Sequence, residues 1–500
     1  MRVSAKNYID YVIFGVLGAL AFAPFKIFIL FFISFGWIFS KIYTEKFKKN
    51  LHRGAFLFFA FFYLANLYWI AVPLTIDLKL HGFLIPIAWI AIPSAYAIVL
   101  MPSIIITEKF KDPFRGAAIF SVIFSMIIYF FGHYCPGFPW VLPGYIWNVH
   151  EIFIQSLSIF GIYGQSFVTI FMAALWGASF VFYQQWDRHS TKISCCWFGF
   201  LFFLIFIFGF LRLENNPINF TEKSLRVVQG NFKKCERESS KFSLQKLQQY
   251  IMDSESDKKI DFIVWPEATV HYLYKSDDNE LNEMLKLPLK DGTYLITGAP
   301  RSDIGGEKIY NSLIAIDNFG KNVAYYDKIH LVPFGEYIPF RRYLPFKNVT
   351  NSIGDFDKGT EKKILKIGDL KIAPMICYEA VFPLECIGNS LFNFFSKNIP
   401  DIDVMINLTN DAWFGSTTEP FQHFEIVRAR AVEMGIPLVR VTNFGISAVF
   451  DSFGRVIGKI SLDQKGVIDC LIPKRSNTQT LYAKYGDLFF FILLLAALFL

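Results

Sequence analysis

Charged residues and cysteines are scarce in this sequence. Charged side chains make up 18% of the 500 residues, whereas hydrophobic side chains make up 53% and Phe alone occurs 58 times. A chain with this composition and a mean hydropathy of +0.37 is too apolar to be surrounded by water, which indicates a membrane protein. The 7 cysteines contain no CxxC pair, and the 8 histidines contain no HExxH motif. We therefore expect no disulfide framework, no bound metal and no cofactor.

Long intervals without acidic or basic residues occupy the first 212 residues. About 20 apolar residues span the core of a bilayer, so each interval can hold one helix. Two shorter apolar runs, near 9–24 and 27–41, precede these intervals and bring the expected number of spans to seven. Each interval is bounded by two charged residues, and the bounding positions are 53 and 77, 79 and 108, 115 and 151, 151 and 187, and 192 and 212.

Basic residues gather in alternate loops between the expected spans. The loops before the first span and after the second, fourth and sixth spans contain Arg2, Lys6, Lys41, Lys46, Lys48, Lys49, Arg53, Lys109, Lys111, Arg115, Arg188 and Lys192. The other loops contain Lys26 and Lys79. Cytoplasmic loops carry an excess of Lys and Arg, so this asymmetry predicts a cytoplasmic N-terminus. The segment after the seventh span is then outside the cytoplasm.

The apolar runs at the two ends of the chain need separate arguments. Residues 18–24, Gly-Ala-Leu-Ala-Phe-Ala-Pro, resemble a signal-peptide cleavage site, but six further spans follow, which favours an uncleaved first span. The run after Asp487 is short for a bilayer core, so we expect an eighth span to begin near Leu481, with Lys484 reaching outward.

The segment at 132–150 combines prolines with aromatic residues. It contains three prolines, two tryptophans and two tyrosines, so we expect it to lie at the outer membrane interface and not to span. The sequence leaves two roles open for this segment. It is either part of an aromatic belt or a loop that contacts substrate.

From about residue 213 onward, charges become frequent and short apolar runs alternate with turn residues. Helical segments at 240–256 and 419–435 separate some of these runs, which predicts an α/β layered domain. We therefore divide the chain into a seven-helix transmembrane domain at 1–212, an α/β domain at 213–480 and a C-terminal span at 481–500. The expected strands are 225–232, 261–268, 293–300, 311–320, 370–379, 403–410 and 438–443.

Three ionisable residues follow apolar runs of the α/β domain. Glu267 follows Ile-Val-Trp-Pro, Lys328 follows Tyr-Tyr-Asp, and Cys377 follows Ala-Pro-Met-Ile. Ligands of open α/β sheets bind beyond the carboxyl ends of the strands, so the three side chains can meet in one cleft. Together they could activate a thiol, because a carboxylate can take its proton and an ammonium can stabilise the thiolate and an oxyanion.

Each of these residues also has a simpler interpretation. Alone, Glu267 is a solvated carboxylate at a strand end, Lys328 belongs to a solvated hairpin, and Cys377 is a small core residue. A Cys–His pair of Cys377 with His330 is a weaker alternative. His423, within Phe-Gln-His-Phe-Glu, is expected on a helix face and not as a metal ligand.

Three motifs, in this order, resemble the nitrilase superfamily. They are Trp-Pro-Glu at 265–267, Lys-x-His-Leu-Val-Pro-Phe-Gly-Glu-Tyr-x-Pro at 328–339 and Cys-Tyr-Glu at 377–379. Seven N-terminal spans, a nitrilase-like domain and a final span resemble one membrane branch of that superfamily, the bacterial apolipoprotein N-acyltransferases. The resemblance implies an αββα sandwich in the extracytoplasmic domain. Thr-Asn-Asp-Ala-Trp-Phe-Gly at 409–415 also fits this family.

The resemblance assigns roles to individual residues. It implies that Glu267 is the general base, Lys328 the oxyanion stabiliser and Cys377 the nucleophile. Glu336 would support the site, and Tyr378 and Glu379 would shape it. Trp413 and Phe414 would belong to a mobile aromatic loop near the lipid entry, although plain packing remains an alternative for both.

The family also implies a reaction. An acyl chain would pass from a membrane glycerophospholipid, phosphatidylethanolamine by resemblance, to Cys377 as a thioester. It would then pass to the α-amino group of the S-diacylglyceryl cysteine of an apolipoprotein. The implied protein is a monomer of the bacterial inner membrane with a periplasmic catalytic domain and no nucleic-acid partner.

One stretch departs from the family pattern. After Val-Gln-Gly-Asn the family continues with proline, lysine and tryptophan, whereas this chain reads Phe-Lys-Lys-Cys after Asn231, so an aromatic lipid contact is missing or supplied elsewhere. Cys235 in this stretch is expected to be incidental.

Two other functions stay open: a membrane-tethered nitrilase or amidase with water as acceptor, and a transporter with an external binding domain. The long charge-free intervals speak against the transporter.

Overall fold

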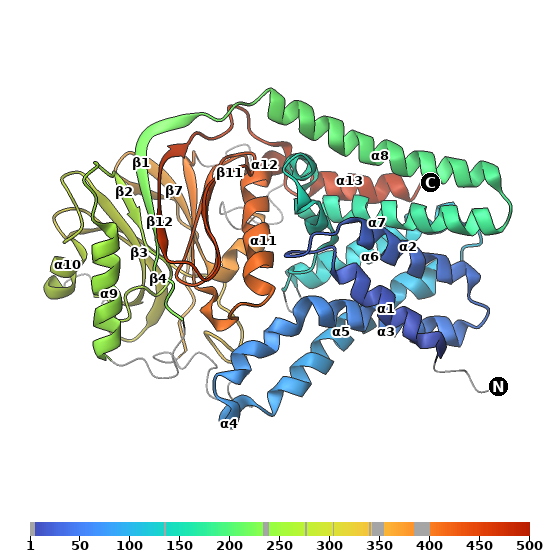
Figure 1. Ribbon diagram of the computed structural model, residues 1–500, viewed down its shortest axis with the longest axis horizontal. Coiled ribbons are helices and arrows are strands. Elements are labelled where there is room, and N and C mark those ends of the chain that lie inside the picture. Colours follow the sequence, from blue (N-terminus) through green and yellow to red (C-terminus); the bar gives the residue numbers. More distant parts are fainter. Residues whose placement is uncertain are drawn as a thin grey trace. The chain divides into compact units, whose positions relative to one another are not determined.

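The computed structural model describes residues 6–134, 137–233, 240–275, 278–303, 305–339, 342, 355–384 and 401–500. The chain forms two compact units, which Figure 1 shows as ribbons. The first unit comprises Met1–Ala71, Phe83–Asn216 and Thr480–Leu500, and it is helical. The second comprises Val72–Gly82 and Pro217–Gln479, and it contains all the strands described below.

The helices of the first unit follow the charge-free intervals of the sequence. Among the described residues, five helical segments are long and apolar enough to cross a membrane, and each overlaps one of the five intervals. They are Lys48–Thr75, Leu84–Thr107, Pro113–His133, Phe153–Gln184 and Arg188–Glu214. The expected membrane character is confirmed. The apolar helices Tyr8–Ala19, Ile29–Thr44 and Leu488–Ala497 are shorter, so the first, second and eighth spans stay predictions.

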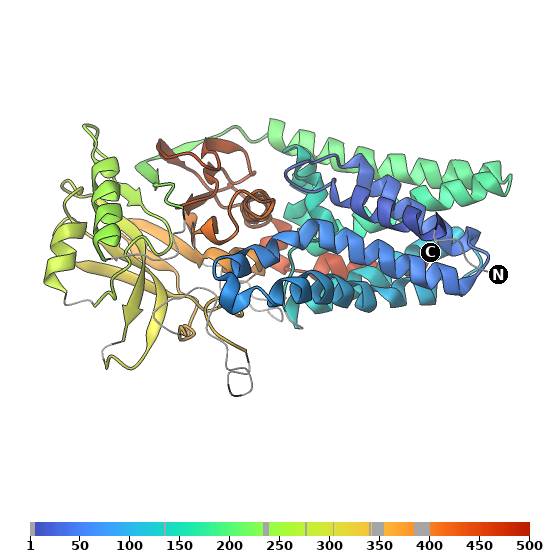
Figure 2. The same cartoon turned by 60° about the horizontal axis from the view of Figure 1, so that its bottom comes forward.

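The helices of this unit pack through small and aromatic residues. Figures 1 and 2 show α3 and α5 lying side by side. Gly36 on α2 and Gly177 on α7 allow a close approach, because a Cβ on Gly177 would lie 2.3 Å from the carbonyl oxygen of Gly36. The main helices are α1 (Lys6–Ala19), α2 (Ile29–Thr44), α3 (Lys48–Leu67), α5 (Leu84–Thr107), α6 (Pro113–His133), α7 (Leu157–Gln184) and α8 (Arg188–Glu214).

The C-terminal segment is broken into two helices. The helix that we expected from Leu481 ends after one turn as α12 (Leu481–Tyr485), and α13 (Leu488–Ala497) follows it. Gly486 between them has φ 56° and ψ −136°, a conformation that glycine tolerates and that ends a helix. The buried carboxylate of Asp487 accepts a hydrogen bond from the hydroxyl of Tyr482 at 3.2 Å.

The proline-rich segment packs inside the helical unit. It contains the 3₁₀ helix Pro143–Val149, and residues 135–136 lie outside the described part. Trp140 and Trp147 are both buried, and Trp147 Nε1 donates to Thr169 Oγ1 at 2.8 Å. These two rings therefore serve as internal packing, and a substrate-contacting role for the segment stays a prediction.

The second unit is built on two mixed sheets. In the described residues each sheet has six strands, in the orders β12-β1-β2-β3-β4-β5 and β11-β10-β9-β8-β7-β6. In the first sheet β1, β2 and β3 run parallel, and in the second β7, β8 and β9 do. The strands are β1 (Phe220–Gln229), β2 (Phe262–Val264), β3 (Tyr294–Ser302), β4 (Ile309–Ile316), β5 (Asn322–Asp327), β6 (Leu365–Ile367), β7 (Leu370–Ile376), β8 (Val404–Thr409), β9 (Leu438–Thr442), β10 (Ser447–Phe450), β11 (Val456–Ile460) and β12 (Gly466–Pro473).

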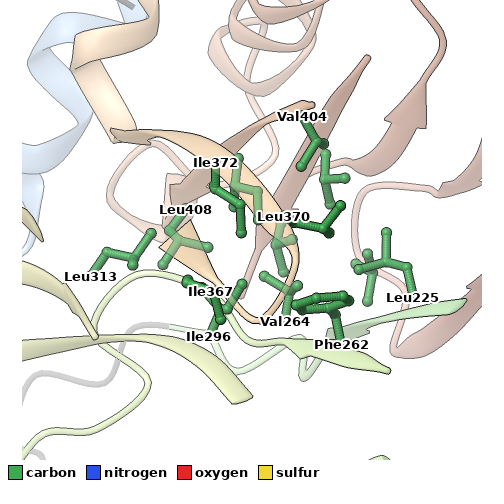
Figure 3. Close-up of a cluster of buried hydrophobic side chains, with 14 of the residues drawn as sticks. Leu225, Phe262, Val264, Ile296, Leu313, Ile367, Leu370, Ile372, Val404 and Leu408 are labelled. Atoms are coloured by element: carbon green, nitrogen blue, oxygen red, sulfur yellow. The ribbon is translucent and has the colours of Figure 1, made fainter. Parts of the chain in front are cut away.

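The two sheets pack face to face, with helices on the outer faces. Figure 3 shows the shared core, in which Leu225 and Val264 of one sheet point toward Ile372 and Leu408 of the other. A second cluster joins the first sheet to α9 (Ser240–Ser254) and α10 (Asn279–Leu285). Helix α11 (Glu419–Met434) packs against β9 of the second sheet. The expected αββα sandwich is therefore confirmed.

The seven strands expected from apolar runs are confirmed as β1, β2, β3, β4, β7, β8 and β9, and the two expected helices as α9 and α11. The strands that were not predicted are β5, β6, β10, β11 and β12. They are short or carry exposed residues between buried ones, and β5 and β12 are examples. An edge strand needs only one buried face, so it does not form the continuous apolar run by which the others were found.

Candidate active site

Glu267 and Lys328 meet as a buried ion pair. Glu267 lies just after β2 and Lys328 directly after β5, at the ends of strands of the first sheet. Lys328 Nζ lies 3.5 Å from Glu267 Oε1 and 2.9 Å from Glu336 Oε2. The Lys328 side chain is 1% exposed, and each carboxylate side chain is 9% exposed. One ammonium is thus shared by two carboxylates in a site that excludes most water.

Asn311 on β4 joins the two carboxylates, and sequence reasoning missed it. Its Nδ2 donates to Glu267 Oε1 at 2.8 Å and to Glu336 Oε1 at 2.7 Å. A side-chain amide has two N–H donors, so it can hold both carboxylates in place. Its position in the apolar run Ile-Tyr-Asn-Ser-Leu-Ile-Ala-Ile was the available signal, since a polar side chain inside a buried strand needs a partner.

Burial and the neighbouring charges shift the pKa values of Glu267 and Lys328 in ways that suit proton transfer by Glu267. Burial raises the pKa of Glu267, and the charge of Glu336 raises it further, while Lys328 and the hydrogen bond from Asn311 act in the opposite direction. Burial alone would lower the pKa of Lys328, but Glu336 and Glu267 outweigh it and raise that pKa. Lys328 is therefore a fixed cation, and Glu267 is a carboxylate of raised basicity.

Cys377 lies at a sharp turn at the end of β7. It opens the 3₁₀ helix η4 (Cys377–Val381) with φ 49°, a left-handed conformation that is costly for a residue other than glycine. Its side chain is partly exposed. Burial raises the pKa of the Cys377 thiol, the charge of Glu267 raises it further, and the charge of Lys328 lowers it. The thiol is thus protonated at neutral pH and needs a base, and Glu267 is close enough to influence it.

Glu379 connects this turn to the segment of Lys328. Its Oε1 accepts hydrogen bonds from the hydroxyl of Tyr326 at 2.7 Å and from the backbone N–H of Ile329 at 2.8 Å. Its Oε2 accepts from the backbone N–H of Ile376 at 2.8 Å and lies 3.5 Å from Lys362 Nζ. Burial would raise the pKa of Glu379, but Lys362 and these donors hold it below its usual range. An ionised Glu379 therefore holds the backbone next to Lys328 and the backbone next to Cys377 in place.

Aromatic residues close to Cys377 and Lys328 in the sequence pack on one another. The ring of Tyr378 makes an edge contact with Phe382 at 5.2 Å, and Phe382 stacks on His330 at 4.2 Å. The stacked ring of His330 supports a packing role for this residue. Trp413 ends the short 3₁₀ helix Asp411–Trp413 after β8, and Phe414 follows it; both are half-buried. Their role as a substrate loop stays a prediction.

A second buried polar cluster lies behind the ends of β8 and β9. Asp411, Glu419 and His423 offer ligand atoms within 4.8 Å of one another, a spacing that could hold a metal ion. Arg440 Nη2, however, lies 2.6 Å from Asp411 Oδ2, so a cation already neutralises that carboxylate. The guanidinium would repel a metal ion, and the donor set fits one poorly. His423 lies on α11, where its Nδ1 is 3.2 Å from Asp411 Oδ1.

The stretch after Asn231 is described only in part. The backbone N–H of Asn231 donates to the carbonyl of Asn443 at 2.8 Å. The ring of Phe232 packs on Tyr250 at 5.7 Å. Cys235 lies outside the described residues. The ring of Phe232 therefore packs against α9, which carries Tyr250.

The αββα sandwich and the buried pair of Glu267 and Lys328 are those expected of a carbon–nitrogen hydrolase fold. Residues 224–480 match the carbon–nitrogen hydrolase family. Residues 14–175 match the apolipoprotein N-acyltransferase N-terminal domain. The chain belongs to the apolipoprotein N-acyltransferase family, a family of acyltransferases, which confirms the resemblance stated above.

Relatives of the same name align along nearly the whole chain. The apolipoprotein N-acyltransferase of Rickettsia prowazekii is 33% identical over 505 residues, covering 99% of this chain and 97% of the relative. That of Rickettsia bellii is 32% identical over 486 residues, covering 97% and 95%. A solved CN-hydrolase superfamily protein of Xanthomonas campestris has a TM-score of 0.38 and 18% identity, covering 50% of this chain and 90% of that chain. Nit3 of Saccharomyces cerevisiae, a nitrilase-superfamily member, has a TM-score of 0.37 and 16% identity, covering 51% of this chain and 90% of that chain.

Proposed function

We propose that this chain N-acylates apolipoproteins through a thioester on Cys377. The observation that carries the proposal is the buried pair of Lys328 and Glu267, 3.5 Å apart, whose charges both act on the Cys377 thiol. The family and the apolar helices suit a reaction between two lipid-anchored substrates. The single-site arrangement predicts two covalent half-reactions with ping-pong kinetics.

The first half-reaction loads the enzyme. Glu267 takes the proton of the Cys377 thiol, and the thiolate attacks the ester carbonyl of a glycerophospholipid. Lys328 stabilises the oxyanion of the tetrahedral intermediate. The ester C–O bond breaks, the lysophospholipid alkoxide takes the proton back from Glu267, and the acyl group remains as a thioester. The proposed donor is phosphatidylethanolamine, and the acyl chain that it gives up is the one at sn-1.

The second half-reaction unloads the enzyme. The free α-amino group of the S-diacylglyceryl cysteine of an apolipoprotein attacks the thioester carbonyl, and Glu267 takes a proton from the amine. Lys328 again faces the oxyanion. The C–S bond breaks as the amide forms, and the Cys377 thiolate leaves and recovers the proton. Glu336, held by the same Asn311 amide as Glu267, keeps Lys328 charged through both steps.

The location and division of the chain follow from the same proposal. We place the protein in the bacterial inner membrane as a multi-pass monomer, with residues 1–212 as the transmembrane domain and 481–500 as a final span. Residues 213–480 would be the catalytic domain on the periplasmic side, where exported apolipoproteins present their lipidated N-terminus. Trp413 and Phe414 would border the lipid entry, and Tyr378 would shape the acyl site.

Mass spectrometry of the purified chain tests the proposal. After incubation with phospholipid, the wild type should carry an acyl adduct on Cys377 that hydroxylamine removes, and Cys377→Ala should carry none. Cys470 on β12, also partly buried, provides the matched control, because Cys470→Ala should keep the adduct. An adduct that survives in Cys377→Ala contradicts the proposal. Hydrolysis of the adduct without transfer to a diacylglyceryl peptide would favour the amidase alternative.

A further inference from the structure

Thr409 lies beside the proposed nucleophile. It is the last residue of β8, which runs parallel to β7 with Leu408 opposite Ile376, so Thr409 and Cys377 stand at neighbouring strand ends. The Thr409 side chain is fully buried. Its hydroxyl lowers the pKa of the Cys377 thiol by hydrogen bonding, against the larger effects of burial and of the charge of Glu267, which raise that pKa. The steps proposed above make no use of this hydroxyl.

The same hydroxyl is bound on its other side. Thr409 Oγ1 donates to Asp411 Oδ1 at 3.1 Å. A hydroxyl has one hydrogen to donate and two lone pairs that accept. While Cys377 is a thiol, its S–H can donate to Thr409, which donates on to Asp411. Once the thiol has lost its proton to Glu267, the thiolate can only accept, and the Thr409 hydroxyl can turn its hydrogen to the sulfur.

We propose that Thr409 is a further catalytic residue, whose hydroxyl donates a hydrogen bond to the Cys377 thiolate in each half-reaction. This inference rests on the proposed function, because it needs Cys377 to act as a thiolate. Hydrogen bonding to the charged form stabilises that form. Lys328 supplies charge to the site, and Thr409 supplies a directed donor at the sulfur itself.

Asp411 can release the hydroxyl because it has other partners. Arg440 Nη2 lies 2.6 Å from Asp411 Oδ2, and His423 Nδ1 lies 3.2 Å from Asp411 Oδ1. Burial would raise the pKa of Asp411, but Arg440 and His423 hold it below its usual value. The carboxylate therefore stays satisfied when Thr409 turns away. Its own charge disfavours the thiolate, and Thr409 lies next to both groups.

Arg440 also fixes the backbone that carries the sulfur. It stands opposite Asn407 in the register of β8 and β9, and its Nη1 donates to Asn407 Oδ1 at 3.0 Å. Asn407 Nδ2 in turn donates to the carbonyl of Cys377 at 3.4 Å. Arg440 is thus a positioning residue, because it holds Asp411 on one side and Asn407 on the other.

Alkylation of Cys377 tests the role of Thr409 directly. The full chain in detergent is treated with iodoacetamide across a pH series, and the modified Cys377 peptide is measured by mass spectrometry. Thr409→Val keeps the shape of the side chain and removes the hydroxyl, whereas Thr409→Ser keeps the hydroxyl. We expect Thr409→Val to be alkylated about 10- to 100-fold more slowly at neutral pH, as for loss of a hydrogen bond to a charged group. Its pH profile should shift upward, and Thr409→Ser should resemble the wild type.

Further outcomes separate the two proposals. A pH profile of Thr409→Val that overlaps the wild type overturns the role of Thr409. Thr409→Ala serves as a second variant, and loss of the melting transition in both would assign Thr409 to folding and also overturn it. If wild-type Cys377 forms no acyl adduct from phospholipid but its alkylation still depends on Thr409, the proposed function fails and the thiolate donor stands.

Discussion

The carboxylate of Glu379 accepts the backbone N–H of Ile329 at 2.8 Å and, on its other oxygen, the backbone N–H of Ile376 at 2.8 Å. Ile329 follows Lys328 and Ile376 precedes Cys377, so one side chain joins the two segments that carry the cation and the thiol. The distance between the proposed oxyanion stabiliser and nucleophile is therefore set by a buried acid that need not touch substrate.

Replacement of this acid should damage both stability and activity. In Glu379→Gln the new amide N–H₂ must face one of the N–H or O–H donors, and Lys362 loses its buried counter-charge. Breaking a buried pair costs about 3 kcal/mol, so the melting temperature in detergent should fall clearly. Asp401→Asn, which weakens an exposed pair with Lys371, is the control and should leave the melting temperature nearly unchanged. Equal melting temperatures for both variants would contradict the role of Glu379.

Asn311 should control the acid limb of the pH–activity profile. Its hydrogen bond lowers the pKa of Glu267, so Asn311→Ala should raise that pKa. Glu267 acts as a base only when ionised, and the acid limb of kcat/KM should therefore move to higher pH. The measurement is acyl transfer to a diacylglyceryl peptide across a pH series. Asn318→Ala, in the β4–β5 turn, should leave the profile in place, and an unmoved acid limb in Asn311→Ala would show that Asn311 does not tune the base.

The strand ends were the predictable part of the site. Apolar runs predicted β2 and β7, and Glu267 and Cys377 follow these two strands. Lys328 follows β5, a strand that was not predicted. The chemistry of the three residues then suggested their meeting. Asn311 could not be assigned a partner in this way, since Glu267 is 44 positions away and only the pairing of strands brings the two together.

The partners within the second buried polar cluster, Asp411, Glu419 and His423, also could not be predicted from the sequence. Sequence reasoning placed His423 on a helix face, which is correct for α11, but gave no sign that the ring faces Asp411. Arg440 lies inside an apolar strand, and a buried guanidinium requires acceptors, yet the sequence does not say which. Register and layer packing supply that answer, because they bring β7, β8, β9 and α11 to one place.

The proposed base and cation should both be needed before any acyl transfer occurs. Glu267→Gln cannot take the thiol proton, and Lys328→Ala removes the charge that faces the oxyanion. Loss of one oxyanion donor typically costs about a hundred- to a thousandfold. Both variants should therefore fail to accumulate the thioester in a single-turnover assay with phospholipid alone. Lys366→Ala, exposed on β6, is the control and should load normally. A variant that loads at nearly the wild-type rate does not have the role assigned to it.

The orientation of the chain decides whether the proposed acceptor can reach Cys377. The basic loops predict that residues 213–480 lie outside the cytoplasm. An alkaline phosphatase, which is active only outside, should be active when joined after Leu225 and inactive when joined within 41–53 or 184–192. This result needs seven spans before the catalytic unit, including the short apolar helices Tyr8–Ala19 and Ile29–Thr44. N-terminal sequencing checks the first of them. A mature chain that starts near Pro24 would identify the first span as a removed signal peptide and leave six spans. Because signal peptides are cut on the outer side, the basic loops would keep their sides and the chemistry proposed for Cys377 would be unaffected. Phosphatase activity of a fusion within 41–53 is the result that would contradict the proposed orientation.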